Sequence, residues 1–471
     1  MAPLIHSRRQ FLTLLGQASA LGAAAPLGLN LLAARSAAAL DDPSDYKALV
    51  CIFLYGGNDA YNTFVPYDRA SHARYSSARS SIAVPRQGLA SQVLNPSNPA
   101  DHGRQIATNP VASDLTDLFN TGKLAVVANV GTLRRPITLD DYRNGRGVPP
   151  KLMSHNDQFS IWQTMDIEGA QSGWGGRMAD LVVAANGESP MLTSISVGTS
   201  AVFAGGTSVD ELAFGNQGPA TLDSVQGNGS FHLDIASRLA SISDQGPHAA
   251  ELRRRYNNAV EGGQQATEVL QGINRLVPRP TGDEVPPIYD QLDTVARTIV
   301  GHQRRNIRRQ VFFVSMGGYD THTASNEVHP GLLTNLAGAM RSFTTAMEQA
   351  GLSDQVTAFT ASDFGRALTT NGQGTDHGWG GHHVVVGGSV KPQTIAGELP
   401  TVRLGGPDDI GQGRLLPAVS VEQYGATLAR WFGVPERELP IVFPGIGAFP
   451  TSDLGFMAPI TPPPGSTTTT A

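Results

Sequence analysis

The chain has 471 residues and carries 34 Lys and Arg against 40 Asp and Glu, a formal net charge of −6. This acidic balance argues against a nucleic-acid partner, and the single cysteine, Cys51, excludes an intrachain disulfide. The length suits one large α/β domain or two, and the 53 Gly and 31 Pro indicate many loops around that scaffold.

Residues 1–39 have the pattern of a twin-arginine signal peptide. Arg8 and Arg9 precede an uncharged, apolar stretch over 11–34, and three alanines at 37–39 form a cleavage site for a signal peptidase. An uncleaved membrane anchor is the alternative, because the stretch is long enough to cross a bilayer. We expect export by the twin-arginine translocase, a periplasmic or extracellular location, and no membrane span in the mature chain.

Apolar runs and helical patterns alternate along the mature chain. This alternation predicts an α/β fold with a mostly parallel central sheet sandwiched by helices. We expect strands at 48–55, 123–130, 191–197, 310–316, 355–361 and 383–386, and helices at 111–121, 154–186 in two pieces, 247–306, 331–350 and 420–432.

The expected domain limits follow from this pattern. Residues 40–460 form a single α/β domain with an insertion near 204–306, which begins with a Gly- and Ser-rich segment. The low-complexity end of the chain, 461–471, is expected to be a disordered tail.

Three predicted strands end in an aspartate beside glycine: Asp59, Asp320 and Asp363. In open α/β sheets, ligands bind beyond the carboxyl ends of the strands, so these acids are candidates for one shared site. Each of them alone could instead be a turn aspartate that binds its own backbone.

Histidines agree with this placement, because five of the twelve fall between residues 322 and 383. Carboxylate and imidazole stand close together in Asp320-Thr321-His322 and in Asp376-His377. This donor set predicts a site for a divalent metal: zinc, manganese, magnesium or calcium.

Three further histidines carry weaker signals. His382 and His383 are adjacent on a predicted strand, so they point to opposite faces, and at most one of them should reach the site. His329 precedes Pro330 at a predicted helix start, and we interpret it as structural.

Ser154 is the best candidate for a hydroxyl nucleophile. It stands at a predicted helix start, where backbone N–H groups can hold an anion. The same position suits a helix N-cap, and both interpretations stay open.

Several motifs together resemble a large bacterial family of uncharacterised exported proteins within the alkaline phosphatase and sulfatase-like superfamily. These motifs are Leu54-Tyr55-Gly56-Gly57-Asn58-Asp59-Ala60-Tyr61-Asn62-Thr63, Ser154-His155, Gly173-Trp174-Gly175-Gly176-Arg177, Gly318-Tyr319-Asp320-Thr321-His322, Ser362-Asp363-Phe364-Gly365-Arg366 and Gly374-Thr375-Asp376-His377-Gly378.

The resemblance implies an alkaline phosphatase-like fold and two metal positions. Asp59 looks like a ligand of one metal, Ser154 falls where the nucleophile is expected, and Asp320 with His322 look like ligands of the other metal. Asp363 and His377 follow in the same chain order.

One departure concerns Phe364, which stands where the superfamily usually has the histidine of an Asp-His pair. Since phenylalanine cannot bind a metal, Asp376 or His382 would have to substitute for that ligand.

Two functions follow as hypotheses. The first is a metal-dependent hydrolase of phosphate or sulfate esters, small or polymeric, in which Ser154 attacks and metals hold the oxyanion. The second is a non-catalytic, metal-stabilised protein for binding or surface assembly on the same scaffold. An oxidoreductase is disfavoured, because no G-x-G-x-x-G follows a predicted strand and no cysteine set for an iron–sulfur cluster exists.

Overall fold

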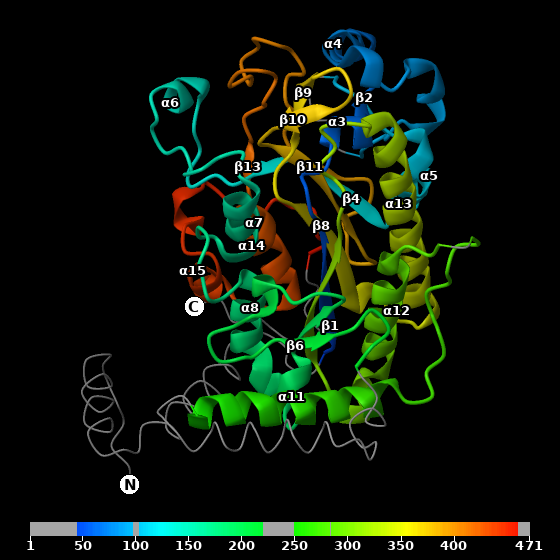
Figure 1. The fold of residues 1–471 in the computed structure, drawn as a ribbon, viewed down its shortest axis with the longest axis vertical. Coiled ribbons are helices and arrows are strands. Elements are labelled where there is room, and N and C mark those ends of the chain that lie inside the picture. Colours follow the sequence, from blue (N-terminus) through cyan, green and yellow to red (C-terminus); the bar gives the residue numbers. More distant parts are fainter. Residues whose placement is uncertain (1–44, 98–102, 220–248, 283, 460–471) are drawn as a thin grey trace.

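The computed structural model describes residues 45–97, 103–219, 249–282 and 284–459. The predicted signal peptide, the tail and part of the Gly- and Ser-rich segment lie outside these residues. Figure 1 shows a central sheet with helices on both sides. The helices are α3 (Ala60–Thr63), α4 (Arg69–Arg79), α5 (Ser113–Asn120), α6 (Leu139–Arg143), α7 (His155–Thr164), α8 (Trp174–Val182), α11 (Ala249–Leu270), α12 (Pro287–Val300), α13 (Ser325–Gln349), α14 (Val421–Phe432) and α15 (Leu439–Val442).

The main sheet has nine strands in the order β12-β4-β11-β8-β1-β7-β5-β6, with β13 also paired to β4. All neighbours run parallel except β11, which is antiparallel to both β4 and β8. The predicted mostly parallel sheet is therefore confirmed. The strands are β1 (Lys47–Leu54), β4 (Leu124–Gly131), β5 (Ser194–Val197), β6 (Leu212–Phe214), β7 (Arg309–Met316), β8 (Val356–Ser362), β11 (Gly381–Val386), β12 (Ile395–Gly397) and β13 (Val419–Ser420).

Strand β1 is buried on both faces, as its continuous apolar run predicts. Val50 and Ile52 pack into the cluster that α5, α12 and α13 cover, whereas Cys51 and Phe53 pack into the cluster under α7, α8 and α14. The two groups of helices lie on opposite sides of the sheet (Figure 1). Cys51 is thus a buried strand residue, as expected.

Helix boundaries follow the local capping chemistry. The predicted capping box of α14 is present between Ser420 and Gln423, and Gly433 ends that helix at φ 106°. By contrast, α13 begins at Ser325, before the expected start, and keeps Pro330 inside its second turn. At this position Pro330 removes one intrahelical hydrogen bond, the one to the Asn326 carbonyl oxygen, and α13 continues through it.

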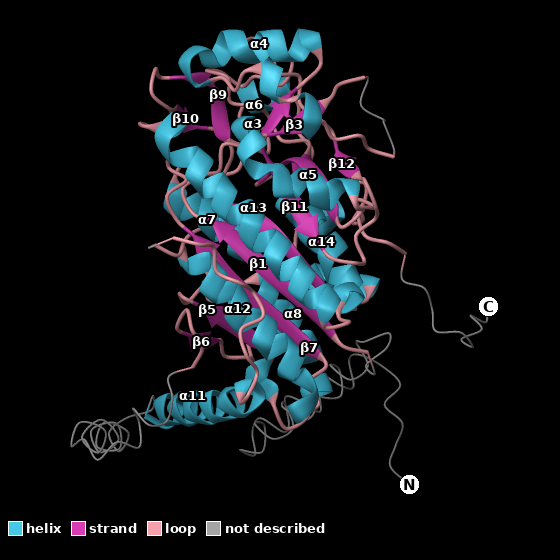
Figure 2. Ribbon diagram, turned by 90° about the vertical axis from the view of Figure 1, so that its right-hand side faces the viewer, coloured by secondary structure: helices cyan, strands magenta, loops and turns pink. Residues whose placement is uncertain are grey.

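Two small sheets lie beyond the carboxyl ends of the main strands (Figures 1 and 2). One pairs β2 (Phe64–Pro66) with β3 (Ile106–Thr108), and the other pairs β9 (Arg366–Thr370) with β10 (Thr375–His377). Neither pair was predicted, because their strands are only three to five residues long. Within the described ranges, no helix is both long and apolar enough to cross a membrane.

Candidate metal centre

The strand-end aspartates lie at one edge of the sheet. Strands β7 and β8 flank β1, and the last residue of β1, Leu54, stands opposite Met316 and Ser362. Because the three strands are parallel and end in register, the turns after them come together. The group of side chains described next lies at this edge.

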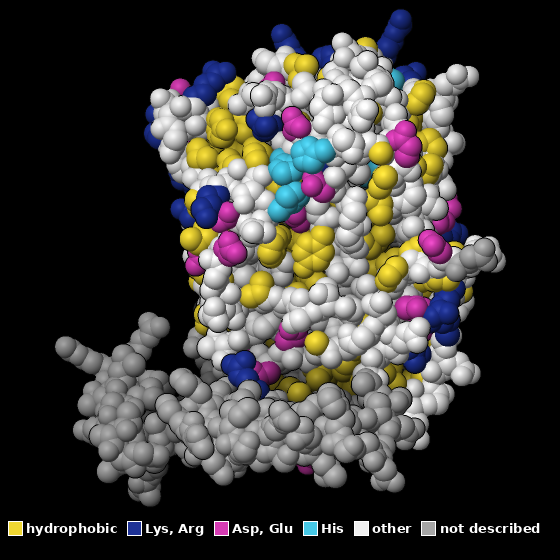
Figure 3. Space-filling view, in the orientation of Figure 1, with side chains coloured by type: hydrophobic (Ala, Val, Ile, Leu, Met, Phe, Trp, Pro, Cys, Tyr) yellow, Lys and Arg dark blue, Asp and Glu magenta, His cyan; other side chains and the backbone are white. Residues whose placement is uncertain are grey.

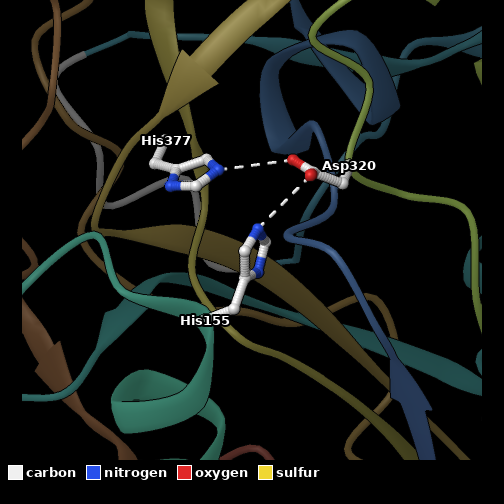
Figure 4. Close-up of side chains that lie close together, drawn as sticks. All are labelled: His155, Asp320 and His377. Atoms are coloured by element: carbon white, nitrogen blue, oxygen red, sulfur yellow. Dashed lines mark hydrogen bonds and ion pairs between the residues drawn. The ribbon is translucent and has the colours of Figure 1, made fainter.

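His155, Asp320 and His377 form a group that could hold a metal ion, with one ligand atom from each lying within 4.8 Å of the others. Asp320 Oδ2 lies 3.4 Å from His155 Nε2, and Asp320 Oδ1 lies 3.3 Å from His377 Nε2. Figure 4 shows both imidazoles facing the carboxylate of Asp320. The group joins the first residue of α7, the turn after β7 and the last residue of β10.

His322 belongs to the same cluster. Its Nε2 lies 2.9 Å from His377 Nε2 and 3.2 Å from Asp320 Oδ1. Histidine side chains gather with acidic side chains on the face seen in Figure 3. The cluster is accessible from outside, since the Asp320 side chain is 46% exposed.

Each imidazole is held at its Nδ1 atom by an oxygen from another part of the chain. The pairs are His155 with Asp363 Oδ2 at 2.6 Å, His322 with Asp376 Oδ1 at 3.4 Å, and His377 with the Met153 carbonyl oxygen at 2.7 Å. Metal-binding histidines commonly have such a partner on the second ring nitrogen, which fixes the tautomer and the ring orientation. All three Nε2 atoms are left to face Asp320.

The donor spacing suits a shared cation. Metal–nitrogen and metal–oxygen bonds of about 2.0–2.2 Å place neighbouring ligand atoms about 3.0–3.5 Å apart. The Asp320 oxygens lie 3.2 to 3.4 Å from the three Nε2 atoms, and the Nε2 atoms of His322 and His377 lie 2.9 Å apart. The Nε2 atoms of His322 and His377 face each other at 2.9 Å. His377 donates from Nδ1, so its neutral Nε2 carries a lone pair toward His322, which either an Nε2–H of His322 or a metal ion would meet.

Burial and the neighbouring charges shift the pKa values of the clustered side chains in opposite directions. Burial favours the protonated acid, but Arg366 and the three histidines lower the pKa of Asp320 below its ordinary value. The hydrogen bond that His155 donates to the Asp363 carboxylate raises the pKa of His155, while burial lowers the pKa of His377. Asp320 is therefore a carboxylate at neutral pH, as a ligand must be.

Phe364 closes one side of the cluster. Its ring centroid lies 4.8 Å from that of His155 and 4.5 Å from that of His377. A Cβ atom on Gly57 would lie 2.5 Å from this ring, so the glycine leaves the space that the ring fills. The residue that cannot bind a metal thus packs against two imidazoles that could.

The predicted ligands divide into three sets. Asp320 and His377 contribute atoms to the group that could hold a metal, and His322 contacts both of them. Asp363 and Asp376 contact the Nδ1 atoms of His155 and His322. Asp59 and His382 belong to neither set.

Asp59 and His382 are directed elsewhere by their own partners. Asp59 is fully buried, caps α3 through Asn62 and forms an ion pair with Arg79. His382 accepts a hydrogen bond from the Asn129 N–H at 3.0 Å and packs against Tyr61. The structure therefore corrects the expectation that they join the metal ligands, since each is satisfied inside the protein.

The adjacent histidines do point to opposite faces, as the strand geometry predicted. His383 packs against Trp162 on the other face of β11, so neither residue reaches the cluster. His329 is buried, with Nε2 3.1 Å from Asn58 Oδ1, in agreement with a structural role.

Ser154 occupies the N-cap position of α7 but makes no capping hydrogen bond. Its hydroxyl donates instead to Asp157 Oδ2 at 2.8 Å. The hydroxyl proton is thus directed to the buried carboxylate of Asp157, two residues after His155 in the sequence.

Two residues of the cluster were missed as site residues in the sequence. His155 stands far from the other histidines along the chain, and its signal was the Ser154-His155 motif, where only the serine was assigned. Arg366 lies in a quoted motif as well, but its sequence neighbours gave no reason to place it beside Asp320.

The chain is similar to several known proteins. A family model described as "Protein of unknown function (DUF1501)" matches residues 46–440. No curated protein matches.

Among solved structures, the chain is similar to Ps i-CgsB in complex with k-i-k-neocarrahexaose, at 9% identity over 86% of this chain and 77% of that chain, with a TM-score of 0.33. It is also similar to the phosphonate monoester hydrolase of Agrobacterium radiobacter, at 9% identity over 83% and 74%, with a TM-score of 0.28. These identities and scores assign no activity to the chain.

Proposed function

Because the chain belongs to the DUF1501 family, whose description gives no function, we propose one from its own site: a metal-dependent hydrolase of phosphate or sulfate esters. His155, Asp320 and His377, with His322 in contact with the last two, would hold one divalent ion. Three nitrogen donors favour zinc or another transition metal over magnesium or calcium, which prefer oxygen.

The observation that carries this proposal is the outward anchoring of the three imidazoles. Each Nδ1 meets an oxygen, and each Nε2 is turned toward one carboxylate. Packing alone gives no reason for three histidines to place Nδ1 against an oxygen and Nε2 toward the same carboxylate. Metal-binding histidines commonly have this orientation.

A bound divalent ion supplies positive charge that stabilises the negative charge developing on a phosphoryl or sulfuryl group. Ser154 is the proposed attacking hydroxyl. Its proton passes to Asp157, which already accepts it in a hydrogen bond, while the serine oxygen forms the new bond and the ester oxygen leaves.

The metal is tested on protein recovered from the periplasm, by mass spectrometry and by turnover of chromogenic phosphate and sulfate esters. Asp320→Ala should lose both the metal and the turnover. Asp354→Ala is the control, because Asp354 lies just before β8, at the opposite end of the strand from the site. Turnover that persists in metal-free Asp320→Ala protein would reject the proposal.

The serine is tested separately. Ser154→Ala should keep the metal and lose turnover by at least about a hundredfold, because removing a nucleophile leaves only binding and electrostatic catalysis. Wild-type turnover in this variant would remove Ser154 from the mechanism while leaving the metal centre in place.

A non-catalytic binding or surface-assembly protein is the second candidate. The packing of Phe364 against His155 and His377 favours it, because a ring takes the place of a further ligand. Metal present with no turnover of any ester in the panel would support this candidate over the hydrolase.

Export completes the proposal, on the pattern of residues 1–39. We expect the mature protein in the periplasm or outside the cell. Replacing Arg8 and Arg9 by lysine should retain the precursor in the cytoplasm, as cell fractionation would detect. Unchanged fractionation of that double variant would reject the twin-arginine route.

A further inference from the structure

Arg366 places a buried positive charge directly against the candidate centre. Its side chain is fully buried, and its Nη2 lies 3.0 Å from Asp320 Oδ1. That same oxygen lies 3.2 Å from His322 Nε2 and 3.3 Å from His377 Nε2. The guanidinium is thus part of the surroundings of the one carboxylate on which the imidazoles converge.

The backbone fixes this position. Arg366 is the first residue of β9 and stands opposite His377 in the antiparallel pair with β10. The two residues therefore present their side chains on the same face of the hairpin. Glycine contacts hold the hairpin close: a Cβ atom on Gly378 would lie 2.6 Å from the Arg366 carbonyl carbon.

Part of the Arg366 guanidinium has no hydrogen-bond partner in the described protein. Its Nε and Nη1 have no hydrogen-bond acceptor among the residues that the structure describes. The N–H groups of buried arginines normally have hydrogen-bond acceptors. A buried guanidinium with two unpaired nitrogens indicates that Arg366 contributes mainly its positive charge to this site.

The charge balance can be counted over the side chains that contact Asp320 or the imidazoles. Among the residues that the structure describes, the charged groups are the carboxylates of Asp320 itself, Asp363 and Asp376 and the guanidinium of Arg366. With neutral imidazoles and one divalent ion, the positive and negative charges cancel. Without Arg366, the same loaded centre would carry one net negative charge and would repel an anion.

We propose that Arg366 is the charge-selecting residue of this site: its fixed positive charge lets the metal-loaded centre accept an anionic ester group. The proposal rests on the proposed metal centre and names its substrate class by charge. Arg366 acts through its contact with Asp320 and through the electrostatic potential that its charge creates at the centre. It is therefore a positioning residue without direct contact to the substrate.

Arg79 offers a matched control, because it is a second buried arginine and its charge is balanced by Asp59, outside the candidate centre. It forms an ion pair with Asp59, donates to the Ala367 carbonyl oxygen at 3.0 Å and packs against Tyr61 and Tyr75. Its loss should affect folding stability but leave the charge of the centre unchanged.

The experiment measures two affinities by calorimetry on folded protein. One is for zinc with metal-free protein, and the other is for inorganic phosphate and sulfate with zinc-loaded protein. For Arg366→Gln, anion affinity should fall about tenfold to a hundredfold, as expected for one lost charge at short range. Zinc affinity should not weaken, because a repelling cation is gone. Arg366→Lys should restore anion binding, and Arg79→Gln should change neither affinity.

The outcomes separate the two proposals. Wild-type protein that binds neither zinc nor the anions would reject the hydrolase and this inference together. Wild-type protein that binds both, with an Arg366→Gln variant of unchanged anion affinity, would reject only this inference. A parallel loss of zinc and anion binding in Arg366→Gln, with Arg366→Lys no better, would also overturn it, because that pattern marks a purely structural residue.

Discussion

Asp59 and Asp320 follow neighbouring strands, and their surroundings give them different tasks. Asp59 is fully buried against Arg79, whereas Asp320 is half exposed among imidazoles. Both acids follow a strand and glycine in the sequence, so their local patterns look alike. The difference comes from Arg79 on α4, which sequence spacing alone does not bring to Asp59.

We predict that Asp59→Asn lowers the free energy of unfolding by about 3–5 kcal/mol, because Arg79 is left as an uncompensated buried charge. The zinc content should stay at the wild-type level, since Asp59 is not a ligand. Denaturant unfolding and metal analysis check the two parts. Loss of the metal in a folded Asp59→Asn variant would return this residue to the list of ligands.

Glu422, which lies away from the candidate metal centre, should make the folding stability depend on pH. Burial raises the pKa of this carboxyl from 4.5 to about 7, against smaller opposing effects of the Gly445 N–H and Arg177. Because the folded-state pKa lies above the unfolded one, the protonated form stabilises the fold below about pH 4.5. That contribution is lost as the pH rises to about 7.

Glu422→Gln should therefore be more stable than the wild type by about 1–3 kcal/mol at pH 8, since each pKa unit corresponds to about 1.4 kcal/mol. At pH 4 to 5 the two proteins should differ little. Urea unfolding at both pH values measures the difference. Parallel pH profiles of stability for the two proteins would contradict the assignment.

At the level of single elements, glycine spacing sets how closely α8 approaches the loop after β5. A Cβ atom on Gly176 would lie 2.1 Å from the Gly205 carbonyl carbon, which is backbone and cannot move aside alone. Gly263 in α11 has nothing within 4 Å of such an atom.

Gly176→Ala should lower the melting temperature, at a cost of about 1–3 kcal/mol for forced overpacking. Gly263→Ala is the matched helical control and should raise stability by about 0.5–1 kcal/mol through helix propensity. Thermal unfolding checks both changes. Equal effects of the two substitutions would mean that the α8 contact does not limit the packing.

Elements with strong local signals were predictable, and elements defined by partners were not. The apolar run of β1 and the Ser420 capping box lie in the sequence itself, and both predictions are confirmed. The start of α13 was misplaced because Pro330 is tolerated in its second turn. Strands β9 and β10 are too short for a periodic signal, yet they carry Arg366 and His377.

For the whole molecule, the parallel arrangement of β7, β1 and β8 was predictable, and with it the edge where the acids collect. The exact ligand set was not, because His155 reaches the cluster from α7, across more than 150 residues of chain from Asp320. Such a contact depends on helix α7 packing over the sheet, which no local pattern records.

Metal removal should act on the molecule as a whole. A ligand that binds only the folded state stabilises it by about 2.7 kcal/mol at a concentration one hundred times its Kd. Treatment with a chelator should therefore lower the melting temperature, and zinc should restore it. Asp320→Asn should abolish this zinc-dependent shift. A shift that survives in this variant would locate the ion elsewhere in the chain.

The Met153 carbonyl that holds His377 has one more consequence. Met153 adopts φ 69°, and its oxygen, not its side chain, accepts the hydrogen bond. Replacing Met153 by alanine keeps that oxygen, so an alanine scan would detect the supports at Asp363 and Asp376 and pass over the third. Only a change to the main chain, such as backbone ester replacement or a shortened loop before α7, would make this support visible to mutagenesis.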